Sequence, residues 1–260
     1  MIRRRFYVPQ DSIRDGVATL PDGQARHLRT VLRIRAGETV EIFDGKGNGY
    51  AGEVELHGSE VRIGRLQSVP FRESAARLIL AAALIKYTKF EWMLEKATEL
   101  GVSEIVPLKT RFSDIRISDA RIALRLERWE RIVGEASKQS RRFTVPQVHA
   151  PLAFSEFLAA EAFSPCARFL LYEKSPTLWP ADPGKLSNGT VVCIGPEGGW
   201  DENEIEQARE AGCKIFGLGS HILRSETAAI AALAIINHQI RQARAAPLLG
   251  SPFPVSGSPF

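Results

Sequence analysis

The chain has 260 residues, which is enough for one large domain or two modest domains with cores of their own. Hydrophobic residues make up 44% and charged residues 25%, as in an ordinary soluble globular protein, and the net charge of +4 permits an anionic partner without requiring one. No run approaches the length of a transmembrane helix, and the N-terminus lacks the apolar core of a secretory signal, so we expect neither a membrane-spanning nor a secreted protein.

The three cysteines also indicate which compartment the protein occupies. Cys166, Cys193 and Cys213 are odd in number and form no C-x-x-C pair. They imply neither a disulfide framework nor a zinc site, and we expect no bound metal. This pattern fits a reducing compartment, so we expect a cytoplasmic protein.

Residues 1–70 have the pattern of a small β-rich domain. Apolar stretches separated by turn signals predict strands at 5–8, 39–43, 50–56 and 61–66. A short helix is expected within 22–35, with Leu28, Val31 and Leu32 on one face. Together these elements predict a small barrel.

The same domain carries a local excess of basic residues. Its first 35 residues hold eight arginines against three acidic residues. Exposed arginines beside a small barrel suit a face that contacts phosphates. They also suit an ordinary solvated surface, and the charge pattern by itself leaves both interpretations open.

A second domain is expected after a linker at 70–74. A buried strand at 78–85, a polar loop at 86–89, a helix at 90–100 that stops at Gly101 and a strand at 103–108 form a unit that requires a parallel sheet. A long amphipathic helix is expected at 121–140, with an apolar face of Leu124, Trp129, Ile132 and Ala136. A further apolar strand is expected at 167–171, and the tail at 246–260, rich in Pro, Ser and Gly, is expected to be disordered.

Residues 190–240 repeat one pattern twice: a strand, a loop containing glycine, and a helix. The strand at 191–194 ends in the loop 195–199 (GPEGG), after which Asp201 and Glu204 form the capping box of a helix. The strand at 214–218 ends at Gly219, and the next helix begins near Ser225 with Glu226 in its first turn, where the helix dipole favours an anion.

Both glycine loops lie at the carboxyl ends of strands, where open parallel sheets bind ligands. Glycine also lets a ligand approach the backbone closely. A tight turn alone would explain one such loop, but two on successive strands, with Glu197, Arg224 and Glu226 beside them, favour a binding cleft. The chain has neither a G-x-G-x-x-G after a strand nor a G-x-x-x-x-G-K-[ST], which argues against a dinucleotide site and a P-loop.

These stretches resemble one known family. GPEGG, an acidic helix and LGSHILRSETAAIAAL are similar to the C-terminal signature of the RsmE-type methyltransferases of the SPOUT class. LIKYTKFEWMLEKATELGVSEIVPL is similar to the central pattern of that family, and RRFYVP and HLRTVLR with IFDG are similar to its N-terminal domain.

The resemblance implies both a fold and an activity. The implied fold is α/β: a SPOUT methyltransferase domain with a trefoil knot at 71–245, preceded by a PUA-like RNA-binding β-barrel at 1–70. The implied activity is methylation of the N3 position of a specific uridine in 16S ribosomal RNA with S-adenosylmethionine, on RNA that belongs to the small subunit. The resemblance also implies a homodimer.

The three strand-end loops are the expected cofactor site. Their backbone groups suit the edge of an adenine, and their apolar side chains suit its faces. With the first turn of the last helix, the expected cofactor-binding residues are Leu171, Tyr172, Glu173, Ile194, Gly195, Pro196, Glu197, Gly198, Gly199, Leu218, Gly219, Ile222, Leu223, Glu226 and Thr227.

The resemblance favours the phosphate-contacting interpretation of the basic residues. The RNA-binding residues that we expect are Arg5, His27, Arg33, Lys86, Lys89, Gln139 and Arg142. One stretch departs from the family, which usually has Glu-Arg-Ser after the strand at 103–108. This chain has Arg111-Phe112-Ser113 there, so the role of Arg111 is left open.

Arg224 is the expected catalytic residue. The uracil imide nitrogen is a poor nucleophile until it loses its proton, and a cation can stabilise the charge that spreads onto the ring oxygens. The alternative is that Arg224 braces the site by pairing with Glu197 or Glu226. His221 lies in the same loop, but the family does not require histidine there, and the catalytic base is left unassigned.

Two other functions compete with this one. The first is a non-catalytic RNA-binding protein that has kept the fold, and the second is a methyltransferase that acts on transfer RNA or on protein. The intact GPEGG and LRSETA loops argue against the first, because a protein without a cofactor would not need them. Physical reasoning from the sequence does not separate ribosomal from transfer RNA.

Overall fold

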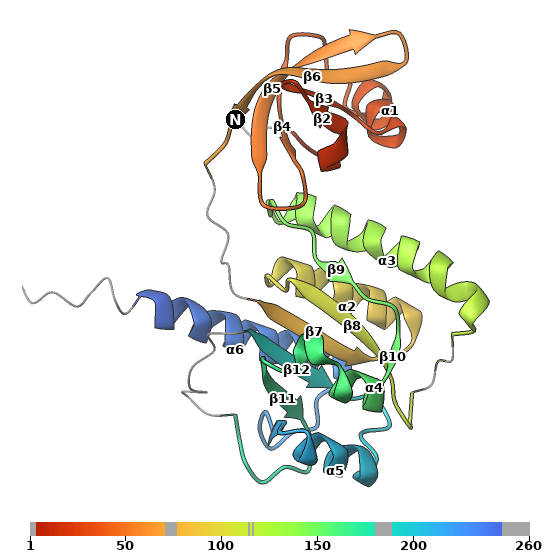
Figure 1. Ribbon diagram of the computed structural model, residues 1–260, viewed down its shortest axis with the longest axis vertical. Helices are drawn as coiled ribbons and strands as arrows, with labels where there is room; N and C mark the ends of the chain where they lie inside the picture. Colours follow the sequence, from red (N-terminus) through yellow and green to blue (C-terminus); the bar gives the residue numbers. More distant parts are fainter. Residues whose placement is uncertain (1–3, 71–76, 114, 116, 180–188, 246–260) are drawn as a thin grey trace, which may run out of the picture.

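The computed structural model of the protein describes residues 4–70, 77–113, 115, 117–179 and 189–245 (Figure 1). Two sheets, one on each side of residues 71–76, organise the chain. The expected linker at 70–74 and the domain boundary at 70/71 fall largely outside the described residues and stay predictions. The expected disordered tail at 246–260 also lies outside them.

The first sheet is a six-stranded half-barrel with the strand order β1-β4-β5-β6-β3-β2. Strand β1 pairs parallel with β4, and the remaining pairs are antiparallel. Its core is centred on the fully buried Leu28 of α1 and on Ile42 and Ile63 of the sheet. The elements are β1 (Arg5–Tyr7), η1 (Gln10–Ser12), β2 (Ile13–Arg14), β3 (Val17–Thr19), α1 (Asp22–Thr30), β4 (Thr39–Phe43), β5 (Gly49–His57) and β6 (Glu60–Ser68).

The predicted strands of this domain are confirmed, but two details differ. The hairpin of β2 and β3 was not predicted, although its turn is Asp15-Gly16, with φ values of 50° and 76° that suit a tight hairpin. Helix α1 ends at Thr30, so Val31 lies beyond it and is 64% exposed. Strands β1 and β2 form the two edges, which leaves the sheet an open half-barrel.

The second sheet is parallel throughout, with the order β10-β8-β7-β12-β11-β13. The short strands β9 and β10 both pair with β8, β9 at its start and β10 at its end. Strand β12, which precedes GPEGG, is therefore central. The elements are β7 (Leu78–Ala83), α2 (Tyr87–Glu99), β8 (Glu104–Lys109), α3 (Asp119–Gln139), β9 (Gln147–Val148), β10 (Leu152–Ala153), α4 (Phe154–Ala159), η2 (Glu161–Phe163), β11 (Ala167–Leu171), β12 (Thr190–Ile194), α5 (Glu202–Glu210), β13 (Lys214–Phe216) and α6 (Ser225–Ala245).

Helices cover both faces of this sheet, so its strands are apolar on both sides (Figure 1). Leu78 and Leu80 of β7 belong to a core shared with α2, α3 and α6. Ile79 and Ala81 belong to a second core shared with α4 and α5. The helices pack on the two faces of the sheet, and the loops at the carboxyl ends of its strands lie outside these helix layers.

Two predictions for the helices are wrong. Helix α2 begins at Tyr87, so the predicted polar loop at 86–89 is mostly the first turn of a helix with a solvated face. In α3, Leu124 is 67% exposed, whereas Trp129 and Val133 are fully buried. Leu124 is five residues from Trp129, which places it about 140° round the helix from the buried face.

Candidate active site

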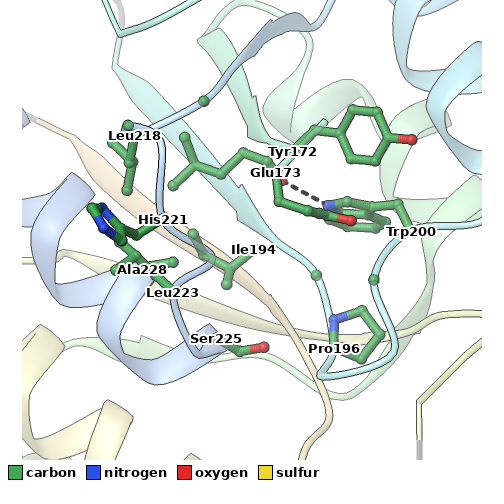
Figure 2. A pocket seen from close by; sticks show the side chains of 15 residues that line it. Tyr172, Glu173, Ile194, Pro196, Trp200, Leu218, His221, Leu223, Ser225 and Ala228 are labelled. Atoms are coloured by element: carbon green, nitrogen blue, oxygen red, sulfur yellow. Dashed lines mark hydrogen bonds between the residues drawn. The ribbon is translucent and has the colours of Figure 1, made fainter. Parts of the chain in front are cut away.

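A cavity lies at the carboxyl edge of the parallel sheet, between the loops after β11, β12 and β13 and the start of α6 (Figure 2). Its volume is about 80 Å³. It is lined by Leu171, Tyr172, Glu173, Ile194, Gly195, Pro196, Gly199, Trp200, Gly217, Leu218, Gly219, His221, Leu223, Ser225 and Ala228. Two loops predicted to form a cleft therefore do lie together, with the end of β11 beside them.

Trp200 ties two of these loops to each other. Its indole Nε1 donates a hydrogen bond to the backbone oxygen of Leu171, 2.9 Å away, shown by the dashed line in Figure 2. A Cβ on Gly195 would lie 2.8 Å from that Nε1 atom, so the loop needs glycine here for the indole to pack against its backbone.

The rest of the GPEGG loop is a tight turn into α5. Gly199 has a φ of 78°, and its N–H donates to the backbone oxygen of Pro196 at 3.0 Å. The predicted capping box is confirmed. Asp201 accepts from the N–H of Asn203, and Glu204 accepts from the N–H of Asp201. The helix therefore begins directly after the cavity, with its cap satisfied.

A charged group lies beside the cavity. Lys89, in the first turn of α2, donates to Glu197 of the GPEGG loop, and its Nζ lies 3.9 Å from Oε1 of Glu226 in α6. The hydrogen bond from Lys89 lowers the pKa of Glu197, and the charges of Lys89, Lys86 and Arg224 lower it further. Oε2 of Glu226 is buried without a hydrogen-bond partner among the described residues.

The predicted cofactor residues fall into two groups. The cavity lining includes Leu171, Tyr172, Glu173, Ile194, Gly195, Pro196, Gly199, Leu218, Gly219 and Leu223. The lining does not include Glu197, Gly198, Ile222, Glu226 and Thr227. Their roles in binding stay predictions. Arg224, the predicted catalytic residue, is exposed at the start of α6 and is also outside the lining.

The expected site did not include Trp200, Gly217, Ser225 and Ala228, nor His221, which was considered and set aside; these five residues complete the cavity. An aromatic residue directly after a glycine loop was an available signal for Trp200. Ala228 follows Ser225 by three residues, the helical spacing that brings it to the same face, but Ala228 has no chemistry of its own to attract notice.

Two of the predicted RNA-binding residues must be corrected. Arg142 is only 7% exposed, and its guanidinium donates to the backbone oxygens of Thr98 and Val102 at 2.8 Å each. The side chain of Arg5 is only 6% exposed and lies between two aromatic rings. Both arginines therefore serve the packing of the fold. Lys89 is held by the two glutamates described above.

The remaining candidates lie at the surface. His27, Arg33, Lys86 and Gln139 are exposed. A groove of about 620 Å³ runs between the half-barrel and the end of α3, and the polar side chains along it belong to Arg4, Arg5, Gln24, His27, Glu135, Lys138, Gln139 and Arg141. The groove therefore has more basic than acidic side chains, and both domains contribute to it.

The stretch that departs from the family pattern contacts the GPEGG segment. The N–H of Arg111 donates to Oε1 of Glu204 at 2.9 Å. Phe112 is 44% exposed, and a Cβ on Gly198 would lie 3.0 Å from the Cβ of Phe112. The residues after β8 therefore support the glycine loop from outside.

Within the described ranges, no three His, Cys, Asp or Glu side chains gather into a group that could hold a metal ion. No helix in the same part of the chain combines the length and the apolar composition needed to cross a bilayer.

Comparisons with known proteins place this site in a family. A model described as an RNA methyltransferase domain matches residues 72–237, and one described as an RNA methyltransferase PUA domain matches residues 20–60. A Synechocystis protein named ribosomal RNA small subunit methyltransferase E is 34% identical over 90% of this chain and 77% of its own length. The chain belongs to this RNA methyltransferase family. A Bacillus subtilis relative of the same name is 31% identical over 83% of this chain and 88% of its own length.

Solved structures of the family agree with the fold. The Neisseria gonorrhoeae ribosomal RNA small subunit methyltransferase E, bound to S-adenosyl methionine, has a TM-score of 0.81 and 33% identity. It is aligned over 91% of this chain and 98% of its own. A Legionella pneumophila putative methyltransferase in complex with the same cofactor has a TM-score of 0.79, with 27% identity over 94% of this chain and 98% of its own. The expected fold class, a SPOUT α/β-knot domain after a PUA-like β-barrel domain, is confirmed, and the structure has that barrel as an open half-barrel.

Proposed function

We propose that this family member transfers a methyl group from S-adenosylmethionine to N3 of a specific uridine in the 16S ribosomal RNA of the small subunit. The matched methyltransferase and PUA domains support RNA methylation, and the curated relatives support ribosomal RNA as the substrate class. The observation in the structure that carries the proposal is the cavity between the three strand-end loops and α6.

The residues present suit S-adenosylmethionine. Ile194, Leu218 and Ala228 offer apolar contact for the faces of an adenine, and the loop backbones offer donors and acceptors for its edge. Glu226 follows the cavity residue Ser225. Its Oε2 is buried and has no hydrogen-bond partner in the part of the chain that the structure describes, so it is suited to accept a hydrogen bond from a ligand ammonium group.

The bound cofactor would supply an electrophilic methyl group on a sulfonium. The site would hold N3 in line with that methyl group while the N3 proton leaves to an acceptor. The protein's part is to align the uracil with the cavity and to stabilise the charge on its ring oxygens as the proton leaves. We assign the second task to Arg224.

Calorimetric titration with S-adenosylmethionine tests the cavity. Wild-type protein should bind about one cofactor per chain. Ala228→Leu keeps a good helix former but fills the cavity, so it should abolish binding. Ala123→Leu makes the same change at an exposed position of α3 and is the control. Normal binding by Ala228→Leu would remove this cavity from consideration.

Nucleoside analysis tests the reaction. Purified protein is incubated with S-adenosylmethionine and either small subunits or 16S ribosomal RNA from cells that lack the gene, and the digested nucleosides are compared with standards. N3-methyluridine is the expected product. A methyl group on another atom, or transfer only to transfer RNA, would contradict the proposal.

We also propose that the protein is a homodimer. Ile222, 83% exposed, and Ile235 of α6, 37% exposed, are apolar side chains that a partner could cover. Light scattering should give a mass about twice the 28.7 kDa of one chain. A mass of one chain at micromolar concentration would argue against this.

A further inference from the structure

The two domains meet at a buried, charged junction. Arg5 lies in β1 of the half-barrel, and Arg142 follows α3 of the second domain. Nη2 of Arg5 donates to the backbone oxygen of Arg142 at 3.1 Å. The guanidinium of Arg5 also lies 4.9 Å from the ring centre of Phe43 and 4.7 Å from that of Phe143. One cation thus joins an aromatic ring from each domain.

Backbone pairing crosses the junction at the same place. The N–H of Gly47 donates to the oxygen of Phe143 at 3.0 Å, and the N–H of Val145 donates to the oxygen of Gly45 at 2.9 Å. The ring of Phe143 fills the place that a side chain on Gly49 would take. The turn between β4 and β5 is therefore held directly by the residues that follow α3.

Arg142 extends this junction into α2. Its Nη1 donates to the oxygen of Thr98, in the last turn of α2 where the helix dipole favours a cation, and to the oxygen of Val102 between α2 and β8. The opposite end of α2 carries Lys89, which pairs with Glu197 and Glu226 beside the cavity. A single helix therefore connects the domain junction to the edge of the candidate active site.

We infer that Arg5, Arg142 and Phe143 form a latch that fixes the half-barrel in the orientation that delivers the target uridine to the cavity. None of the three lines the cavity, so they are positioning residues. The link to RNA rests on the proposed function. Holding reacting groups in line accounts for much of enzymatic rate, and a misplacement of about 1 Å can cost about 100-fold.

Three variants separate the latch from phosphate contacts. Arg5→Met removes the cation but keeps an unbranched side chain, and Phe143→Leu loosens the same junction without changing any charge. Arg4→Met is the matched control, because Arg4 is the exposed neighbour of Arg5 and lines the same basic groove. We expect kcat for RNA methylation to fall about tenfold or more in the two latch variants. Arg4→Met should change only KM for RNA, and Arg5→Lys should restore part of kcat.

A second measurement does not depend on catalysis. Amide hydrogen exchange at Gly47 and Val145 should be faster in Arg5→Met and Phe143→Leu than in wild type and Arg4→Met, while the affinity for S-adenosylmethionine stays the same. Unchanged exchange, or a KM effect alone in Arg5→Met, would overturn the latch. If wild type fails to methylate ribosomal RNA, the proposed function fails, and the exchange data still decide whether the latch exists.

Discussion

At the scale of single residues, two clusters of charged and polar side chains lie at opposite ends of the strands of the parallel sheet. Lys89, Glu197 and Glu226 lie at the carboxyl edge beside the cavity. Glu104, at the start of β8, lies at the other edge with Arg77 and His149. The first cluster is part of the candidate active site, and the second stabilises the folded sheet.

Arg224→Ala tests the catalytic assignment. If Arg224 stabilises charge in the transition state, the methylation rate at saturating RNA and cofactor should fall about 100-fold or more, with little change in either affinity or in the melting temperature. Arg224→Lys should recover part of the rate, since it keeps the charge without the guanidinium fork.

A bracing role gives the opposite pattern. Arg224 acts electrostatically on Glu197, so a brace would show as a lower melting temperature and weaker cofactor binding when Arg224 is removed. The rate would then return at saturating cofactor. A near-normal saturated rate for Arg224→Ala would end the catalytic assignment.

The environment of Glu104 leads us to expect that the folded protein is less stable in acid. The hydrogen bond from His149, followed by that from Arg77, holds the pKa of Glu104 at about 2, against the burial that raises it. Because the pKa is lower in the folded chain, the stabilisation is complete above about pH 4.5 and is lost as the pH falls toward 2. The shift corresponds to about 3 kcal/mol at most.

Urea unfolding at several pH values checks this. The stability advantage of wild type over Glu104→Gln should shrink as the pH falls from 5 to about 2. Glu130→Gln, at an exposed position of α3, should follow wild type. Parallel stability curves for wild type and Glu104→Gln would contradict the assignment.

At the scale of elements, the loop between β13 and α6 exposes two apolar side chains beside the cavity. Ile222 is 83% and Leu223 is 37% exposed. The cavity volume of about 80 Å³ is well below the roughly 300 Å³ or more of usual ligand sites, so we expect this loop to shift when a nucleoside binds.

Amide exchange with and without S-adenosylmethionine tests that shift. Residues 217–224 should exchange more slowly when the cofactor is bound, because the loop then packs on the ligand. The turn at 44–47 of the half-barrel is the internal control and should not respond. Unchanged exchange at 217–224 under conditions where calorimetry shows binding would place the ligand elsewhere.

At the scale of the whole molecule, the basic groove between the half-barrel and α3 predicts salt-dependent RNA binding. Arg141 lines this groove with a φ of 59°, which asparagine tolerates, so Arg141→Asn removes a charge without adding backbone strain. It should weaken RNA binding and lower the slope of log affinity against log salt by about one unit. Arg209→Gln, on the exposed side of α5, should leave the slope unchanged. RNA affinity that does not depend on salt would rule out the groove as the RNA path.

The sequence by itself determined the elements whose signals are local. The strand ends at 194 and 216–218, the glycine turns and the capping box of Asp201 and Glu204 depend on residues that are neighbours in the chain. Periodicity and turn chemistry report such features directly. The two-domain architecture and the family followed from the same stretches.

Only the tertiary structure decided which charged residues face solvent. Arg5 and Arg142 are of the residue type that contacts RNA phosphates. Arg142 nevertheless donates to carbonyl oxygens 44 and 40 residues away, and Arg5 donates to a carbonyl oxygen 137 residues away. The exposed Leu124 and the cavity position of Ala228 were likewise set by the elements that pack around them. Burial is a property of the assembled neighbours, so a side chain's own chemistry and spacing do not reveal it when those neighbours are distant in the chain.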